Sequence, residues 1–71
     1  MPVVRIEWLP GRSDASKQAL ADRITQAFHE VCGIKPEVLD IIFQTVDRGD
    51  WFVGGQSYAS RPVPGVTPEP E

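Results

Sequence analysis

The sequence predicts an α/β (α+β) domain built on a single βαβ unit. Residues 3–9 and 39–46 alternate between side chains that would face opposite sides of a sheet, as strands do. Residues 14–32, between them, instead place apolar side chains at helical spacing. Two strands joined through a helix are expected to lie parallel, with a right-handed crossover.

The first predicted strand, residues 3–9, has two different faces. One face is apolar throughout and consists of Val4, Ile6 and Trp8. The other face mixes apolar and charged residues and consists of Val3, Arg5, Glu7 and Leu9. Pro10 and Gly11 are expected to end the strand because both favour turns, and Arg12 lies in this turn.

The helix is predicted from its two ends and from its apolar stripe. Ser13 is the expected N-cap, and Asp14 puts a negative charge near the positive end of the helix. Gly33 is well suited to end the helix. One apolar stripe runs along it and consists of Leu20, Ile24, Ala27, Phe28 and Val31.

The second predicted strand, residues 39–46, has apolar residues on both faces, so we expect it to be covered at least partly on each side. Residues 35–37 read as a tight turn before it, and residues 47–50 read as a loop after it. Residues 51–55 are compact and hydrophobic, and their two glycines are expected to permit a turn.

The chain has 71 residues, which we assign to one domain at residues 1–61 and a proline-rich tail at residues 62–71. A chain of this size buries only about 60% of its unfolded surface and is marginally stable alone. A single cysteine, Cys32, excludes an internal disulfide, and a single histidine, His29, argues against a structural metal. We therefore expect a homo-oligomer, in which two βαβ units form a four-stranded sheet with both helices on one face.

Charge and hydropathy exclude several classes of partner. A net charge of −3 argues against nucleic-acid binding, which needs a basic face. Uninterrupted apolar runs reach only three residues, such as 41–43, so no membrane span is expected. The absence of a cationic, apolar signal segment and the lone thiol favour the cytoplasm.

Pro2 is the residue with the most distinctive chemistry. Removal of Met1 would turn Pro2 into an N-terminal secondary amine, which could act as a general base or a nucleophile. An ordinary α-amino group is mostly protonated at neutral pH, but apolar cover from Trp51 or Phe52 and a nearby cation such as Arg12 would lower the pKa of this amine. The alternative is that Pro2 only begins a strand, where proline is tolerated.

The order and spacing of several short motifs make the chain from Pro2 to about Arg61 resemble the 4-oxalocrotonate tautomerase family. These motifs are Pro2 after the initiator, Gly11-Arg12-Ser13, Asp14-Ala15-Ser16-Lys17, Gly33, Trp51 and Val53-Gly54-Gly55.

The resemblance implies an enzyme that forms dimers and usually hexamers, needs no cofactor or metal, and belongs to aromatic-compound catabolism. Pro2 would move a proton between the enol oxygen and a carbon of a 2-hydroxydienoate or 2-oxo acid. Arg12 would bind the substrate carboxylate, as a two-pronged guanidinium can. Trp51 would form an apolar wall of the pocket.

Asp40 is the main departure from the family pattern, because the well-studied members carry a second arginine at this position. An ionised carboxylate repels an anionic substrate and donates no hydrogen bond. Another cation could take over this role, with Arg5, Arg48 and Arg61 as candidates. Otherwise the substrate could carry one carboxylate, Asp40 could activate water, or Asp40 could be a solvated strand residue.

These options leave three hypotheses for the function. The first is a keto–enol tautomerase that uses Pro2, Arg12 and Trp51. The second is a hydratase or decarboxylase on the same fold, with Asp40 near a water; dehalogenation is disfavoured because Leu9 replaces the further arginine of the related dehalogenases. The third is a non-enzymatic oligomeric module whose proline-rich tail engages a partner.

Overall fold

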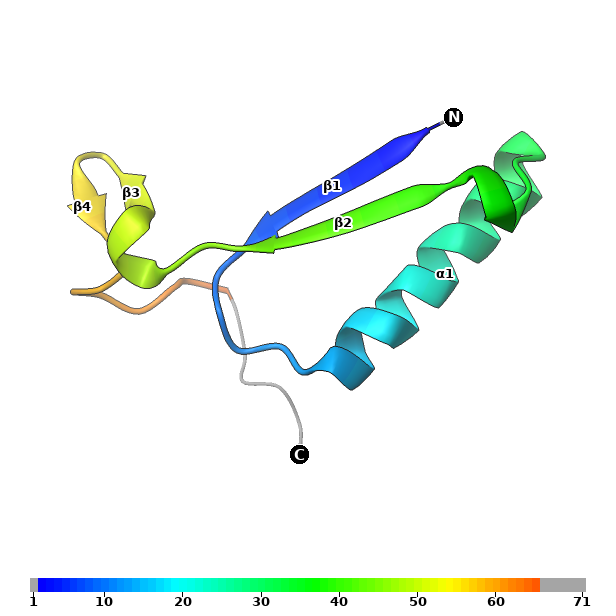
Figure 1. Ribbon diagram of the computed structural model, residues 1–71. Coiled ribbons are helices and arrows are strands. Elements are labelled where there is room, and N and C mark those ends of the chain that lie inside the picture. The colour runs from blue at the N-terminus through cyan, green and yellow to red at the C-terminus, as the bar shows by residue number, and fades with distance from the viewer. Residues whose placement is uncertain (1, 66–71) are drawn as a thin grey trace.

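The computed structural model describes residues 2–65 and contains the predicted βαβ unit followed by a small hairpin (Figure 1). Strand β1 spans Val3–Trp8, helix α1 spans Asp14–Cys32 and strand β2 spans Asp40–Thr45. A short 3-10 helix, η1 (Pro36–Val38), precedes β2. A second one, η2 (Arg48–Asp50), follows β2 and leads into the hairpin. Residues 66–71 of the predicted tail lie outside the described residues.

The two long strands confirm the predicted topology. β1 pairs with β2 in parallel, with Val3 opposite Asp40 and Trp8 opposite Thr45. The backbone pairing extends past β2, because the Val46 N–H donates to the Trp8 carbonyl at 2.8 Å. The sheet has only these two strands, so within residues 2–65 each of them leaves one edge unpaired.

Helix α1 begins and ends at the predicted residues. The Ser13 hydroxyl accepts a hydrogen bond from the Ser16 N–H at 3.1 Å, as an N-cap side chain does. Gly33 ends the helix with a φ of 70°, a left-handed conformation that glycine adopts at little cost. The Gly33 N–H donates to the His29 carbonyl at 3.0 Å, which satisfies one of the last carbonyls of the helix.

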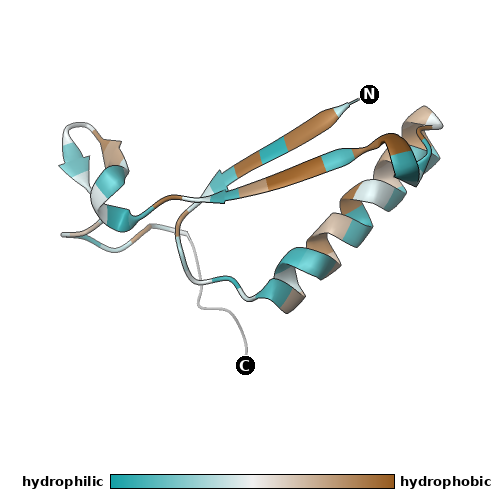
Figure 2. Ribbon diagram, viewed as in Figure 1, coloured by the Kyte–Doolittle hydropathy of each residue, from teal (hydrophilic) through white to brown (hydrophobic). Residues whose placement is uncertain are grey.

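The helix lies along one face of the sheet, and apolar residues gather on both strands and along α1 (Figure 2). Trp8 and Phe43 stack with their ring centroids 5.0 Å apart, at half-buried positions. Ile24 and Phe28 of the predicted helical stripe are also half-buried. Val31 is 82% exposed, so the stripe is wider than the surface that the protomer covers.

Within one protomer the opposite face of the sheet is open, contrary to the expectation that β2 is covered on both sides. Val3 is 55% exposed, and Ile42 is exposed as well. None of the residues from 2 to 65 is fully buried. The radius of gyration is 14.9 Å, whereas a compact domain of this length has about 11 Å. The protomer therefore has no closed core of its own.

After β2, residues 48–50 of the expected loop form η2, and the turn expected at the two glycines closes a hairpin. Strands β3 (Phe52–Val53) and β4 (Gln56–Ser57) pair antiparallel. Gly54 and Gly55 form the turn between them with φ values of 61° and 81°. Two successive positive φ values define the two-residue turn that matches the twist of a hairpin. The hairpin lies at the end of the sheet away from the N-terminus (Figure 1).

No helix of the described residues has the length and apolar character needed to cross a membrane.

Candidate active site

Pro2 and Asp40 lie side by side at the amino-terminal ends of the two parallel strands. The Asp40 N–H donates to the Pro2 carbonyl at 3.1 Å, one residue before the β1–β2 register begins. Pro2 is half-buried and Asp40 is exposed. Asp40, the predicted departure from the family pattern, is thus hydrogen-bonded through its backbone to Pro2, while its cross-strand partner is Val3.

Arg12 lies in the loop that follows the other end of β1. Its guanidinium Nη1 donates to the Gly11 carbonyl at 3.3 Å, and Gly11 has a φ of 123° that favours glycine. Six residues of extended strand separate this loop from Pro2, which corresponds to about 20 Å. A single protomer therefore does not bring Pro2 and Arg12 together (Figure 1).

Trp51 lies at the same end of the sheet as Arg12, because it follows the carboxyl end of β2. Trp51 is half-buried and ends η2, where its N–H donates to the Arg48 carbonyl at 3.4 Å. Its ring centroid is 6.4 Å from that of Tyr58, with the planes inclined at 58°. Trp51 is therefore well placed to form an apolar wall near Arg12, but not near Pro2 of its own chain.

Tyr58 is a neighbour of Trp51 that the sequence analysis did not identify. Its N–H donates to the Trp51 carbonyl at 3.1 Å, which continues the hairpin ladder by one pair. The signal for it was available, since Trp51 and Tyr58 are equally far from the Gly54-Gly55 turn and must face each other if that turn closes a hairpin.

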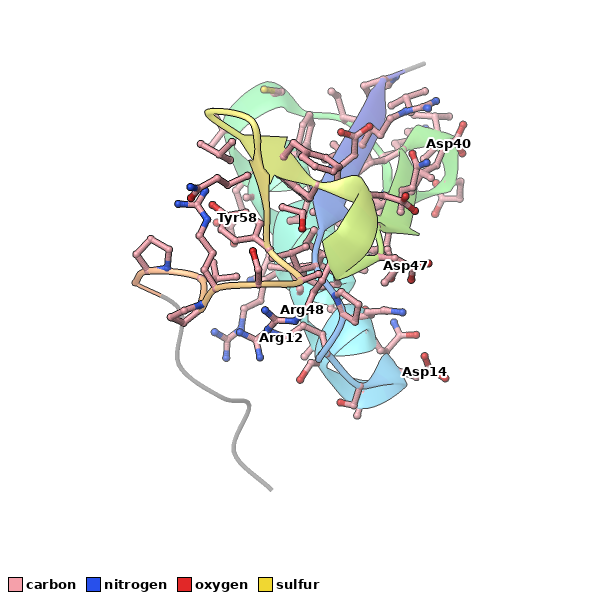
Figure 3. The ribbon with its side chains drawn as sticks, turned by 90° about the vertical axis from the view of Figure 1, so that its left-hand side faces the viewer. Arg12, Asp14, Asp40, Asp47, Arg48 and Tyr58 are labelled. Carbon is pink, nitrogen blue, oxygen red and sulfur yellow. The ribbon has the colours of Figure 1, made fainter. Side chains whose placement is uncertain are left out.

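Two arginines, Arg48 and Arg61, contact Tyr58. Arg48 Nη1 donates to the Tyr58 carbonyl at 3.3 Å. The Arg61 guanidinium carbon lies 4.8 Å from the centroid of the Tyr58 ring, within the range of a cation–π contact. Figure 3 shows Arg12, Arg48 and Tyr58 on one side of this view and Asp14, Asp40 and Asp47 along the other.

Two further residues have no part in this arrangement. The His29 ring lies at the end of α1, where its Nδ1 is 3.2 Å from the Ile34 carbonyl. Cys32 is a free, exposed thiol. Across residues 2–65, no three histidine, cysteine or acidic side chains gather closely enough to hold a metal ion.

A family model described as "Tautomerase enzyme" matches residues 2–61, so the chain belongs to the tautomerase family. It is similar to a probable tautomerase of Ralstonia nicotianae, with 34% identity over 87% of this chain and 95% of that protein. A probable tautomerase of Halalkalibacterium halodurans is also 34% identical, over 79% of this chain and 92% of that protein.

Solved structures agree with this assignment and confirm the resemblance to 4-oxalocrotonate tautomerase. TomN, a 4-oxalocrotonate tautomerase homologue of the tomaymycin biosynthetic pathway, has 38% identity and a TM-score of 0.78, covering 84% of this chain and 92% of its own. A heterohexamer 4-oxalocrotonate tautomerase from Chloroflexus aurantiacus J-10-fl has 33% identity and a TM-score of 0.75, covering 84% and 97%.

Proposed function

We propose that the protein is a cytoplasmic keto–enol tautomerase of 2-hydroxydienoates and related 2-oxo acids, with Pro2 as the general base and acid. The observation that carries the proposal is the position of Pro2, which directly precedes the first strand of a tautomerase-family chain. Only the loss of Met1 is needed to make its nitrogen a secondary amine. Its half-buried position supports the amine as a base, because partial desolvation disfavours the charged form.

The proposed reaction is two proton transfers at this nitrogen. The amine takes the hydroxyl proton of the enol, and the O–H electron pair becomes the second bond of the ketone. The double bond next to the hydroxyl then shifts one position along the conjugated chain. The electron pair of the second double bond takes the proton back from the prolinium ion, at the terminal carbon of the conjugated system. The base is therefore regenerated in each cycle, and no cofactor or metal is required.

The site requires at least two copies of the chain. About 20 Å of strand separates Pro2 from the loop that carries Arg12, so in the proposed site the substrate carboxylate binds Arg12 and Trp51 of another copy. The open sheet edges and the lack of a fully buried residue among those described support the same conclusion. We propose a homo-oligomer of paired βαβ units, either a dimer or a hexamer made of three such dimers.

Asp40 supports a second candidate, hydration of an unsaturated acid on the same fold. Asp40 is on the neighbouring strand with its backbone N–H bonded to the Pro2 carbonyl, and a carboxylate close to the Pro2 amine would favour the protonated form of that amine. A prolinium ion is a proton donor, and Asp40 could activate the attacking water. The related decarboxylation and dehalogenation reactions have no such supporting observation.

The experiment combines intact mass with an enol ketonisation assay. Mass should show that Met1 is removed. The wild-type protein should ketonise 2-hydroxymuconate or phenylenolpyruvate, and Pro2→Ala should lower kcat/KM by about 10²–10⁴-fold while the oligomer stays intact. Pro64→Ala, which changes an exposed proline, is the matched control and should behave like wild type. Retained Met1, or an unimpaired Pro2→Ala variant, would contradict the proposal.

Asp40→Asn separates the two candidates. A tautomerase should keep or gain activity at neutral pH, because the change removes a negative charge from the strand next to Pro2. A hydratase should lose most of its turnover of an unsaturated acid. If neither activity is detected in the wild-type protein, the non-enzymatic binding module becomes the better interpretation.

A further inference from the structure

Arg61 is held in place more firmly than a solvated surface arginine would be. Its guanidinium carbon lies 4.8 Å from the centroid of the Tyr58 ring, and Nη2 donates to the Val53 carbonyl at 3.4 Å. Its Nε is enclosed and has no hydrogen-bond partner among the described residues. Leaving a buried donor unpaired has a free-energy cost, so this position needs an explanation beyond simple packing.

No carboxylate of residues 2–65 neutralises the charge of Arg61. Across residues 2–65 it forms no ion pair with a carboxylate, and its sequence neighbours Ser60 and Pro62 are uncharged. A guanidinium has five N–H donors, and Arg61 forms one hydrogen bond to the described part of the chain. The remaining donors suit a carboxylate, which can accept two of them at once.

Arg61 lies on the same surface as Trp51, the aromatic residue of the proposed pocket. Tyr58 stacks under Arg61, and its ring centroid is 6.4 Å from that of Trp51. Arg48 supports this surface by donating to the Tyr58 carbonyl at 3.3 Å. Trp51, Tyr58 and Arg61 therefore form a continuous surface at the end of the sheet that also carries Arg12.

The other two candidate cations are less suitable. Arg5 is an exposed residue in the middle of β1, on the open face of the sheet. Arg48 already donates to a backbone carbonyl and has acidic neighbours in the sequence at Asp47 and Asp50. Arg61 also donates one hydrogen bond to a backbone carbonyl, but its sequence neighbours Ser60 and Pro62 are uncharged.

We propose that Arg61, held on the Tyr58 ring, is the second carboxylate-binding residue of the active site and selects dicarboxylate over monocarboxylate enols. It supplies the positive charge that Asp40 does not. The proposal rests on the function proposed above, because it takes Arg12 and Trp51 as parts of the substrate pocket.

The test measures binding rather than turnover. The probes are trans,trans-muconate and sorbate, which share a six-carbon diene and differ in carrying two carboxylates or one. Calorimetric titration of the full chain should show about tenfold tighter binding of muconate. Arg61→Gln should remove this preference by weakening muconate about tenfold and leaving sorbate unchanged.

Two further variants complete the design. Arg23→Gln removes the same charge from an exposed position of α1 and should leave both affinities unchanged. Arg61→Lys keeps the charge but not the planar fork, so it should retain part of the preference. If Arg61→Gln does not assemble, Arg61→Lys takes its place in the test.

Equal weakening of muconate and sorbate in the Arg61 variants, no effect on either, or no muconate binding by the wild-type protein would overturn the proposal. If Arg61→Gln weakens only muconate while Pro2→Ala leaves turnover intact, the Arg61 site stands and the proposed function fails.

Discussion

The separation of Pro2 and Arg12 makes a quantitative prediction about mixed oligomers. Pro2→Ala should replace the secondary amine by a less effective primary amine, and Arg12→Ala should remove the carboxylate ligand, so each variant alone should have very low activity. If each site takes Pro2 from one copy and Arg12 from another, random assembly of equal amounts gives about one intact site in four. If both residues came from one chain, no site would be intact.

The assay is ketonisation by the two variants, unfolded together and refolded as a mixture. Each variant refolded alone is the control, and wild-type protein refolded in the same way sets the full activity. We expect the mixture to recover about a quarter of that activity. A mixture no more active than its components, in oligomers shown by mass to contain both chains, would refute the shared site.

Three further predictions concern stability. Because no described residue is fully buried, the Tm should depend on protein concentration, and dilution should reduce the helical circular dichroism signal. A folded monomer at low concentration would contradict this prediction. Ser13→Ala should destabilise the protein by about 1 kcal/mol, because α1 loses the bond to the Ser16 N–H, and an unchanged Tm would show that this cap contributes nothing. Phe43→Ala should lower the free energy of unfolding, measured by denaturant titration, by about 2–3 kcal/mol because the stack on Trp8 is lost. A smaller loss than that of Ser13→Ala would mean that the stack is not part of the core.

The βαβ unit could be predicted because its signals are local. Ser13 and Gly33 were identified from capping chemistry, and both cap α1 as expected. The strands end within a residue of their predicted limits, at Trp8 and Thr45. Alternation and helical spacing are properties of neighbouring residues, so they do not require knowledge of the rest of the fold.

The parts that were missed depend on contacts between segments. The two strands of the hairpin are too short to show alternation, so only the paired glycines at Gly54 and Gly55 pointed to it. Val31 belongs to the helical stripe by periodicity, but periodicity does not tell which apolar residues one protomer covers. The pairing of Arg61 with Tyr58 follows from the hairpin and could not be deduced without it.

The separation of the site residues illustrates a different limit. Motif order groups Pro2, Arg12 and Trp51 as members of one pocket, yet strand direction puts Pro2 at one end of the sheet and the other two at the opposite end. The sequence therefore indicated candidate residues for the site without indicating that the proposed site has to take them from different copies of the chain.

The most direct test of the catalytic proposal is a titration of the Pro2 nitrogen by ¹⁵N NMR in the assembled wild-type protein. We predict a free secondary amine whose pKa is lower than that of an ordinary α-amino group, so that much of it is neutral at pH 7. A nitrogen still bonded to Met1, or one that stays protonated throughout the neutral range, would contradict its role as the base.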